Sequence, residues 1–141
     1  MVPTPFPQTG GALQLSGGAG AIEAVVEWPV AAPRRDVVAV ICYPHPLHGG
    51  TMTNKVVTSA AQALRDLGCA TLRFNFRGVG ASAGEHDAGR GEGEDLVAIC
   101  DWIRAMRPTA RLVLGGFSFG AYVSMMRAAD IRPDLLVSLA P

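Results

Sequence analysis

A continuous apolar run, Val37–Tyr43 (VVAVICY), constrains the fold of this chain more than any other feature. It is rich in β-branched residues and does not alternate with polar ones, which is typical of a central parallel strand covered on both faces. From this run onward, strand-like and helix-like segments follow one another in the order βαβαβαβ. Strands that alternate with helices predict a mostly parallel sheet, so the sequence indicates an α/β fold.

The segment before this core differs in its periodicity. Ala12–Leu15 and Ala21–Trp28 are strand candidates, and the second alternates apolar with partly charged positions, which predicts an antiparallel N-terminal hairpin. Residues 1–9 are proline-rich and are expected to form an extended tail. No repeat or linker divides the chain, so residues 1–141 are expected to form a single domain.

The later elements are expected from helical periodicity, apolar runs and glycine or proline stops. A glycine-rich loop is expected over residues 78–93, and the acidic run from Glu92 to Asp95 suits a first helical turn favoured by the helix dipole. The expected elements are a helix from Asn54 that ends at Gly68, strand Ala70–Phe76, helix Leu96–Met106, strand Arg111–Gly116, helix Phe119–Ala129 and strand Leu135–Ala140.

Charge and composition exclude several classes of partner. The 12 basic side chains balance 12 acidic ones, so no net field favours nucleic acid or an anionic membrane surface. The first residues lack the basic and apolar regions of a signal peptide, and no apolar run is long enough to span a bilayer. The three cysteines lie inside apolar segments, which favours buried free thiols and a cytoplasmic location.

The segment that carries chemistry is Gly116-Phe117-Ser118-Phe119-Gly120, a G-x-S-x-G pattern. An apolar strand is expected to end at the serine and a helix to start directly after it, which is the context that a nucleophile elbow requires. Glycines two residues before and after the serine remove Cβ atoms that would collide in so tight a turn. The amide groups at the start of the helix favour a developing oxyanion. A small-residue turn that packs a helix on a sheet is the structural alternative.

A second oxyanion donor is expected from the loop that follows Val37–Tyr43, because that loop lies at the same sheet edge as Ser118. Its sequence, from His45 to Gly50, contains two glycines that permit the backbone to turn its N–H groups toward the site. A proline- and glycine-rich turn with incidental histidines is the alternative interpretation.

Three segments together, CYPHPLHGGTMTNKVV, RFNFRGVGASAG and GGFSFGAYVS, resemble the small α/β-hydrolases without a lid that are identified as serine hydrolases or esterases. The resemblance covers nearly the whole chain. It implies that Ser118 is the nucleophile, that the Phe119 N–H is one oxyanion donor and that the Leu47 position supplies the other. It also implies that Asn75–Gly80 shapes the rim of the site. A small acyl substrate is expected, with no cofactor and no metal.

The family places its acid and its histidine after the serine, and here the chain departs from the pattern. Asp130 and Asp134 are the only carboxylates after Ser118, no histidine follows it, and both aspartates are expected at the opposite sheet edge. The resemblance implies further C-terminal strands and helices, so the chain is expected to be truncated and inactive by itself. The alternative to a serine hydrolase is an inactive fragment or remnant that self-associates through the exposed edge of its last strand.

Other site interpretations are weaker. His45, His48 or His86 could replace the missing base, or bind zinc together, but no ligand spacing typical of zinc supports the second option. The glycines at 78, 80 and 84 do not match the dinucleotide fingerprint of an NAD(P)-binding domain and precede more loop instead of a helix. Gly49–Lys55 likewise lacks the spacing of a phosphate-binding loop.

Overall fold

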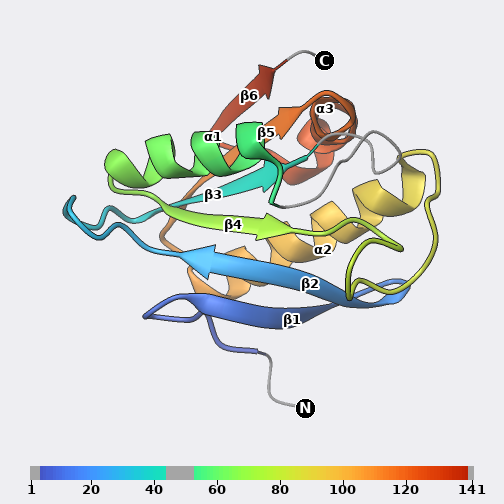
Figure 1. Ribbon diagram of the computed structural model, residues 1–141, viewed down its shortest axis with the longest axis horizontal. Helices are drawn as coiled ribbons and strands as arrows, with labels where there is room; N and C mark the ends of the chain where they lie inside the picture. The colour runs from blue at the N-terminus through green and yellow to red at the C-terminus, as the bar shows by residue number, and fades with distance from the viewer. Residues whose placement is uncertain (1–3, 44–52, 140–141) are drawn as a thin grey trace.

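The computed structural model describes residues 4–43 and 53–139 of the chain. Within these residues six strands form one sheet in the order β1-β2-β4-β3-β5-β6, with α1 on one face and α2 and α3 on the other (Figure 1). The strands are β1 Gly11–Gly17, β2 Gly20–Glu27, β3 Val37–Cys42, β4 Ala70–Phe74, β5 Arg111–Phe117 and β6 Leu135–Leu139. The helices are α1 Lys55–Asp66, α2 Arg90–Met106 and α3 Phe119–Ile131.

The pairing of the strands confirms the α/β architecture expected from the sequence. β3 pairs in parallel with β4 and β5, and β5 pairs in parallel with β6. β1 and β2 form the antiparallel hairpin, and β2 joins the sheet antiparallel to β4. The carboxyl ends of β3, β4 and β5 therefore meet at one edge, where ligands of α/β sheets bind.

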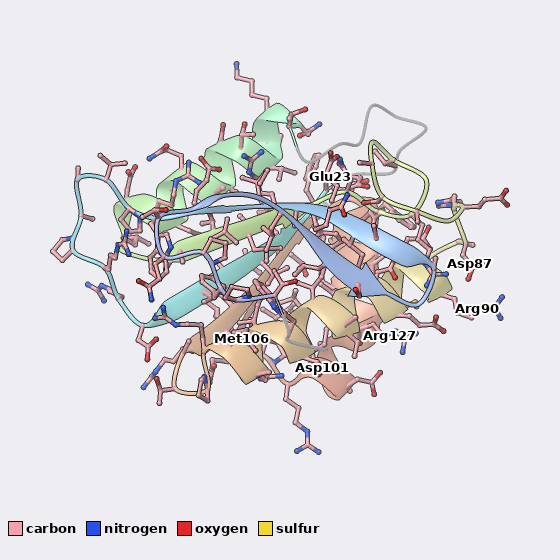
Figure 2. The ribbon with its side chains drawn as sticks, turned by 90° about the horizontal axis from the view of Figure 1, so that it is seen from below. Glu23, Asp87, Arg90, Asp101, Met106 and Arg127 are labelled. Carbon is pink, nitrogen blue, oxygen red and sulfur yellow. The ribbon has the colours of Figure 1, made fainter. Side chains whose placement is uncertain are left out.

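Most predicted boundaries agree with the structure to within about two residues, including the acidic first turn of α2 at Glu92, but the predicted glycine-rich loop extends too far into this helix. The helix begins at Arg90, so Gly91 and Gly93 are helical and do not belong to the preceding loop. Met106, Asp101 and Arg90 mark the course of this long helix when the molecule is seen from below (Figure 2). The early start arises because the Glu92 carboxylate accepts the backbone N–H of Gly89 and caps the first turn.

The described part of the N-terminal tail, residues 4–9, is irregular, as expected, but it packs closely on the hairpin and α2. Phe6 is only 8% exposed, and its ring lies 5.4 Å from that of Trp102 and 5.8 Å from that of Trp28. The indole N–H of Trp28 donates to the carbonyl of Pro7, and that of Trp102 donates to the carbonyl of Thr4. Aromatic contacts between distant segments therefore fix the tail.

Replacing Phe6 by alanine is expected to lower the free energy of unfolding by about 3 kcal/mol, because it leaves a cavity between Trp28 and Trp102. Urea denaturation followed by tryptophan fluorescence measures the change. Val30→Ala is the control, since Val30 is fully exposed and its truncation should change stability by less than about 0.5 kcal/mol. Equal stabilities of the two variants would contradict the tight docking of the tail.

β6 carries large apolar side chains that are exposed to solvent, and it is the last strand of the sheet among the described residues. An apolar groove of about 180 Å³ lies beside it, between α1 and the strands β5 and β6. An exposed apolar edge favours association with another strand, so self-association through β6 stays a prediction. The exposed residues are Leu135, Leu136, Val137 and Leu139.

Two further findings concern the cysteines and the apolar character of the helices. All three cysteines are free and buried, as expected. No helix in the described part of the chain has the length and apolar character to cross a membrane.

Candidate active site

Ser118 lies at the junction between β5 and α3, with Phe117 as the last strand residue and Phe119 as the first helical one. Its backbone has a φ of 56° and a ψ of −115°, a conformation that residues other than glycine rarely adopt. Two hydrogen bonds hold this turn: the Ser118 N–H donates to the Leu139 carbonyl at 2.9 Å, and the Tyr122 N–H donates to the Ser118 carbonyl at 3.1 Å. Ser118 is half-buried at the carboxyl edge of the sheet.

The glycines on either side of Ser118 are required by close backbone approach. A Cβ on Gly120 would lie 2.5 Å from the carbonyl carbon of Cys42 and 2.5 Å from the carbonyl oxygen of Tyr43. A Cβ on Gly116 would lie 2.6 Å from the backbone nitrogen of Ala121. The sequence pattern therefore reflects real steric limits: the helix turns back onto the sheet with no room for a side chain at either position.

The same close packing keeps the nearest thiol unreactive. Cys42, whose backbone touches Gly120, is fully buried, and burial raises the pKa of its thiol well above the ordinary value. A buried thiol with a raised pKa stays protonated and is a poor nucleophile. Ser118, by contrast, is only half-buried at this junction.

Phe119 follows Ser118 and carries the backbone N–H that was predicted to stabilise an oxyanion. Its ring packs against an aromatic cluster, with ring centres 5.5 Å from Phe76, 5.4 Å from His86 and 6.3 Å from Tyr122. Leu47, the second predicted oxyanion donor, lies outside the described residues, as do His45 and His48.

The predicted rim segment, Asn75–Gly80, begins where β4 ends, at the same sheet edge as Ser118. It is tied to β2 through Ser82, whose hydroxyl donates to the Asn75 carbonyl at 2.6 Å and accepts the Glu23 N–H at 2.9 Å. Gly78 and Gly80 have positive φ angles, which the tight turns of this loop require. The segment is therefore held firmly beside the junction.

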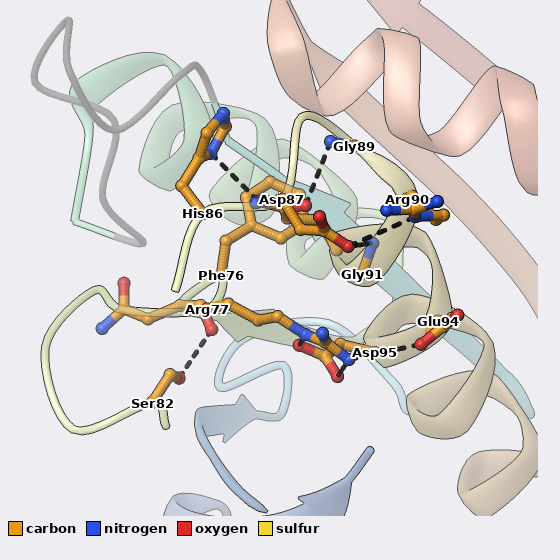
Figure 3. Close-up of polar contacts among 12 residues, drawn as sticks. Phe76, Arg77, Ser82, His86, Asp87, Gly89, Arg90, Gly91, Glu94 and Asp95 are labelled. Carbon is orange, nitrogen blue, oxygen red and sulfur yellow. Dashed lines mark hydrogen bonds and ion pairs between the residues drawn. The ribbon is translucent and has the colours of Figure 1, made fainter. Parts of the chain in front are cut away.

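Arg77 anchors this loop to α2 through a buried ion pair with Asp95 (Figure 3). Arg77 Nε lies 3.0 Å from Asp95 Oδ2, and Nη2 lies 3.2 Å from Oδ1, while the two side chains are 12% and 4% exposed. Burial raises the pKa of Asp95 above its ordinary value of 3.8, and the hydrogen bonds and charge of Arg77 act in the opposite direction.

Replacing Arg77 by methionine is expected to lower the free energy of unfolding by about 3 kcal/mol at neutral pH, because Asp95 would be left buried and unpaired. The loss of Arg77 should raise the folded-state pKa of Asp95 further. Since this folded-state pKa lies above the unfolded one, the variant regains stability as Asp95 becomes protonated on acidification and loses it as the pH rises through that pKa.

Urea denaturation at neutral and at mildly acidic pH measures this dependence. Arg90→Met is the matched control, because Arg90 is 79% exposed in its ion pair with Asp87 and should change stability by less than about 1 kcal/mol. A penalty for Arg77→Met that is independent of pH would show that Asp95 is not the group left uncompensated.

His86 lies beside the Ser118 junction, since its ring centre is 5.4 Å from that of Phe119. Its Nδ1 is 3.0 Å from Oε2 of the fully buried Glu92. Glu92 lies in the first helical turn, as predicted, but the sequence does not predict its burial. A serine or threonine at position 89 would have formed the usual capping-box signature, but Gly89 stands there, so the pattern gave no sign of the buried carboxylate.

Asp130 and Asp134 have structural roles far from Ser118, as expected. Asp130 is exposed and pairs with Arg127 at 3.3 Å. Asp134 Oδ2 accepts the N–H of Leu112 at 2.7 Å, near the opposite end of β5 from Ser118. Among the residues that the structure describes, no group of three histidine, cysteine or acidic side chains could hold a metal ion.

Comparison with known proteins identifies the family. A family profile for the alpha/beta hydrolase fold matches residues 47–140, which include Ser118 and its flanking glycines. The chain belongs to the α/β-hydrolase family. This assignment agrees with the sheet order and with the strand–turn–helix junction at Ser118.

Three bacterial proteins are similar to this α/β-hydrolase. The structure is similar to that of an α/β serine hydrolase without a lid from Xanthomonas campestris, with 50% identity, a TM-score of 0.95 and 98% of this chain covered. An α/β serine hydrolase homologue from Coxiella burnetii is 46% identical, with a TM-score of 0.91 over 96% of this chain. An uncharacterized protein of Rickettsia prowazekii is 46% identical over 106 residues, 72% of this chain.

The match covers only part of these relatives. The chain spans 64% of the Xanthomonas protein, 65% of the Coxiella protein and 44% of the Rickettsia protein.

Proposed function

We propose that this α/β-hydrolase acts on an ester, thioester or similar acyl bond and that Ser118 is its nucleophile. The observation that carries the proposal is the backbone of Ser118, held at a φ of 56° between a strand and a helix and flanked by Gly116 and Gly120. Strain of this kind is costly and is retained where a side chain must project from a tight turn. The similarity to serine hydrolases without a lid also supports it.

In the proposed reaction, Ser118 Oγ attacks the carbonyl carbon of the substrate and forms a new C–O bond. The electron pair of the carbonyl bond moves to its oxygen, which the N–H of Phe119 and an N–H of the Leu47 region stabilise. The hydroxyl proton passes to a histidine base and then to the leaving group as the acyl–enzyme forms. Water hydrolyses the acyl–enzyme by the same steps. This chemistry needs no metal or cofactor.

The three histidines of these 141 residues all precede Ser118, whereas the family order places the base after the serine. We therefore expect the 141-residue chain by itself to hydrolyse p-nitrophenyl acetate negligibly. Turnover by this chain that is lost in Ser118→Ala would overturn that expectation and point to His45, His48 or His86 as the base.

The alternative is a catalytically inactive α/β-hydrolase chain that assembles through β6. The exposed apolar side chains of β6 favour it, since they would be buried by pairing with another strand. The substrate, the partners and a cytoplasmic location are likewise parts of the proposal.

A fluorophosphonate probe separates the two candidates. With the full-length gene product, the probe is expected to form an adduct on the peptide that contains Ser118, detected by mass spectrometry. Absence of this adduct, together with concentration-dependent association in gel filtration, would reject the hydrolase and support the inactive assembly.

A further inference from the structure

The carboxylate of Glu92 is an unusual feature beside the Ser118 junction, because its side chain is fully buried. Its Oε2 accepts the N–H of Asp87 at 2.9 Å, and its Oε1 accepts the N–H of Gly89 at 3.0 Å. The Glu92 carboxylate thus holds both ends of the turn between Asp87 and Gly89. Hydrogen bonds to a carboxylate are stronger than those between neutral groups.

The same carboxylate also orients His86. Glu92 Oε2, which accepts the Asp87 N–H, also lies 3.0 Å from His86 Nδ1. This contact restrains the position of the imidazole ring. The fixed ring lies 5.4 Å from the ring of Phe119, the residue next to Ser118.

The backbone of the turn also lies close to α3. Gly89 has a φ of +100°, and a Cβ there would lie 2.8 Å from the ring of Tyr122 and 3.9 Å from that of Phe119. Ala88 also has a positive φ of 51°, so the turn is held in a strained conformation. The turn at residues 87–89, which Glu92 holds by hydrogen bonds, therefore packs against the first helical turn after Ser118.

We propose that Glu92 is a positioning residue for the Ser118 site: through His86 and Gly89 it holds Phe119 and the first turn of α3 in place. This inference rests on the proposed function, in which the Phe119 N–H faces the developing oxyanion. Displacement of that N–H by even a fraction of an ångström weakens a preorganised donor. The buried Glu92 side chain prevents such displacement because it holds the turn that packs against α3.

Hydrogen exchange of single amides tests the proposal without requiring catalysis. Glu92→Gln keeps the shape of the side chain, but its NH₂ group must face either Asp87 or Gly89 as a second donor. The exchange of these two amides is expected to accelerate at least about tenfold. Exchange of the Ser118 and Tyr122 amides, whose hydrogen bonds hold the junction, should accelerate at least about threefold because the turn that packs against α3 becomes more mobile.

Glu94→Gln is the matched control, since Glu94 lies on the same helix, is 57% exposed and should leave all four amides unchanged. The amide of Val40 in β3 reports global unfolding and should not change in either variant. Acceleration confined to Asp87 and Gly89 would overturn the proposal, because Glu92 would then stabilise only its own turn.

Substitutions of His86 keep the test decisive if Glu92→Gln fails to fold. His86→Phe keeps a ring against Phe119 but loses the contact with Glu92, so it should accelerate exchange of the Ser118 and Tyr122 amides, though less than His86→Ala, which removes both the contact and the ring. Normal exchange in His86→Ala would refute the route through His86. In the full-length protein, Glu92→Gln should slow fluorophosphonate labelling about tenfold. Absence of labelling in the unmodified protein would instead refute the proposed function and leave the exchange result intact.

Discussion

Replacing Ser118 by alanine or by glycine is expected to abolish fluorophosphonate labelling of the full-length protein, by at least about 10³-fold in rate. Both substitutions remove the hydroxyl that attacks the probe. Labelling is followed by gel fluorescence over time. Ser16→Ala is the control, because Ser16 is an exposed serine in β1, away from the junction, and should leave labelling unchanged.

The two Ser118 variants are expected to differ in stability. Ser118 has a φ of 56°, which strains any residue with a Cβ by about 1–3 kcal/mol, and glycine adopts this conformation without strain. Ser118→Gly should therefore raise the free energy of unfolding by about 1 kcal/mol, whereas Ser118→Ala should not. If urea denaturation gives the same free energy of unfolding for Ser118→Gly and Ser118→Ala, the positive φ at Ser118 does not destabilise the protein.

The order and type of the elements could be predicted because each depends on local periodicity. The continuous run at Val37–Cys42 is buried as expected, and the alternation in β2 places Ile22, Ala24 and Val26 in the core. The helical state of Gly91 and Gly93 at the start of α2 could not be predicted, since helix propensity disfavours glycine. A buried carboxylate, which no local pattern reports, stabilises that first turn.

The candidate site divides in the same way. The G-x-S-x-G pattern indicates the junction because Gly116, Ser118 and Gly120 lie within five residues of the chain, although the backbone that limits Gly120, at Cys42 and Tyr43, is distant in the sequence. The contact of His86 with Phe119 joins two segments that are more than thirty residues apart in the sequence, so it depends on the folded loop. Docking of Phe6 between Trp28 and Trp102 likewise depends on the folded core.

Replacing Gly120 by alanine is expected to destabilise the protein by about 3 kcal/mol or more and to displace the Ser118 turn. In an ordinary helix this substitution stabilises by about 1 kcal/mol, because alanine has the higher helix propensity. Here the new Cβ would lie 2.5 Å from backbone atoms of Cys42 and Tyr43, which no side-chain rotation can relieve. The contact outweighs the propensity, so α3 must move away from β3.

Gly115→Ala is the matched control, since it adds the same methyl group near the Ser118 junction, at a position in β5. Its Cβ would lie no closer than 3.8 Å to the Val137 carbonyl oxygen and 3.9 Å to that of Val40, which are ordinary contacts. We expect it to change the free energy of unfolding by less than about 0.5 kcal/mol in urea denaturation. Equal stability of the two alanine variants would mean that α3 can shift freely on the sheet. A rigid junction, with Ser118 held by close backbone packing, requires that they differ.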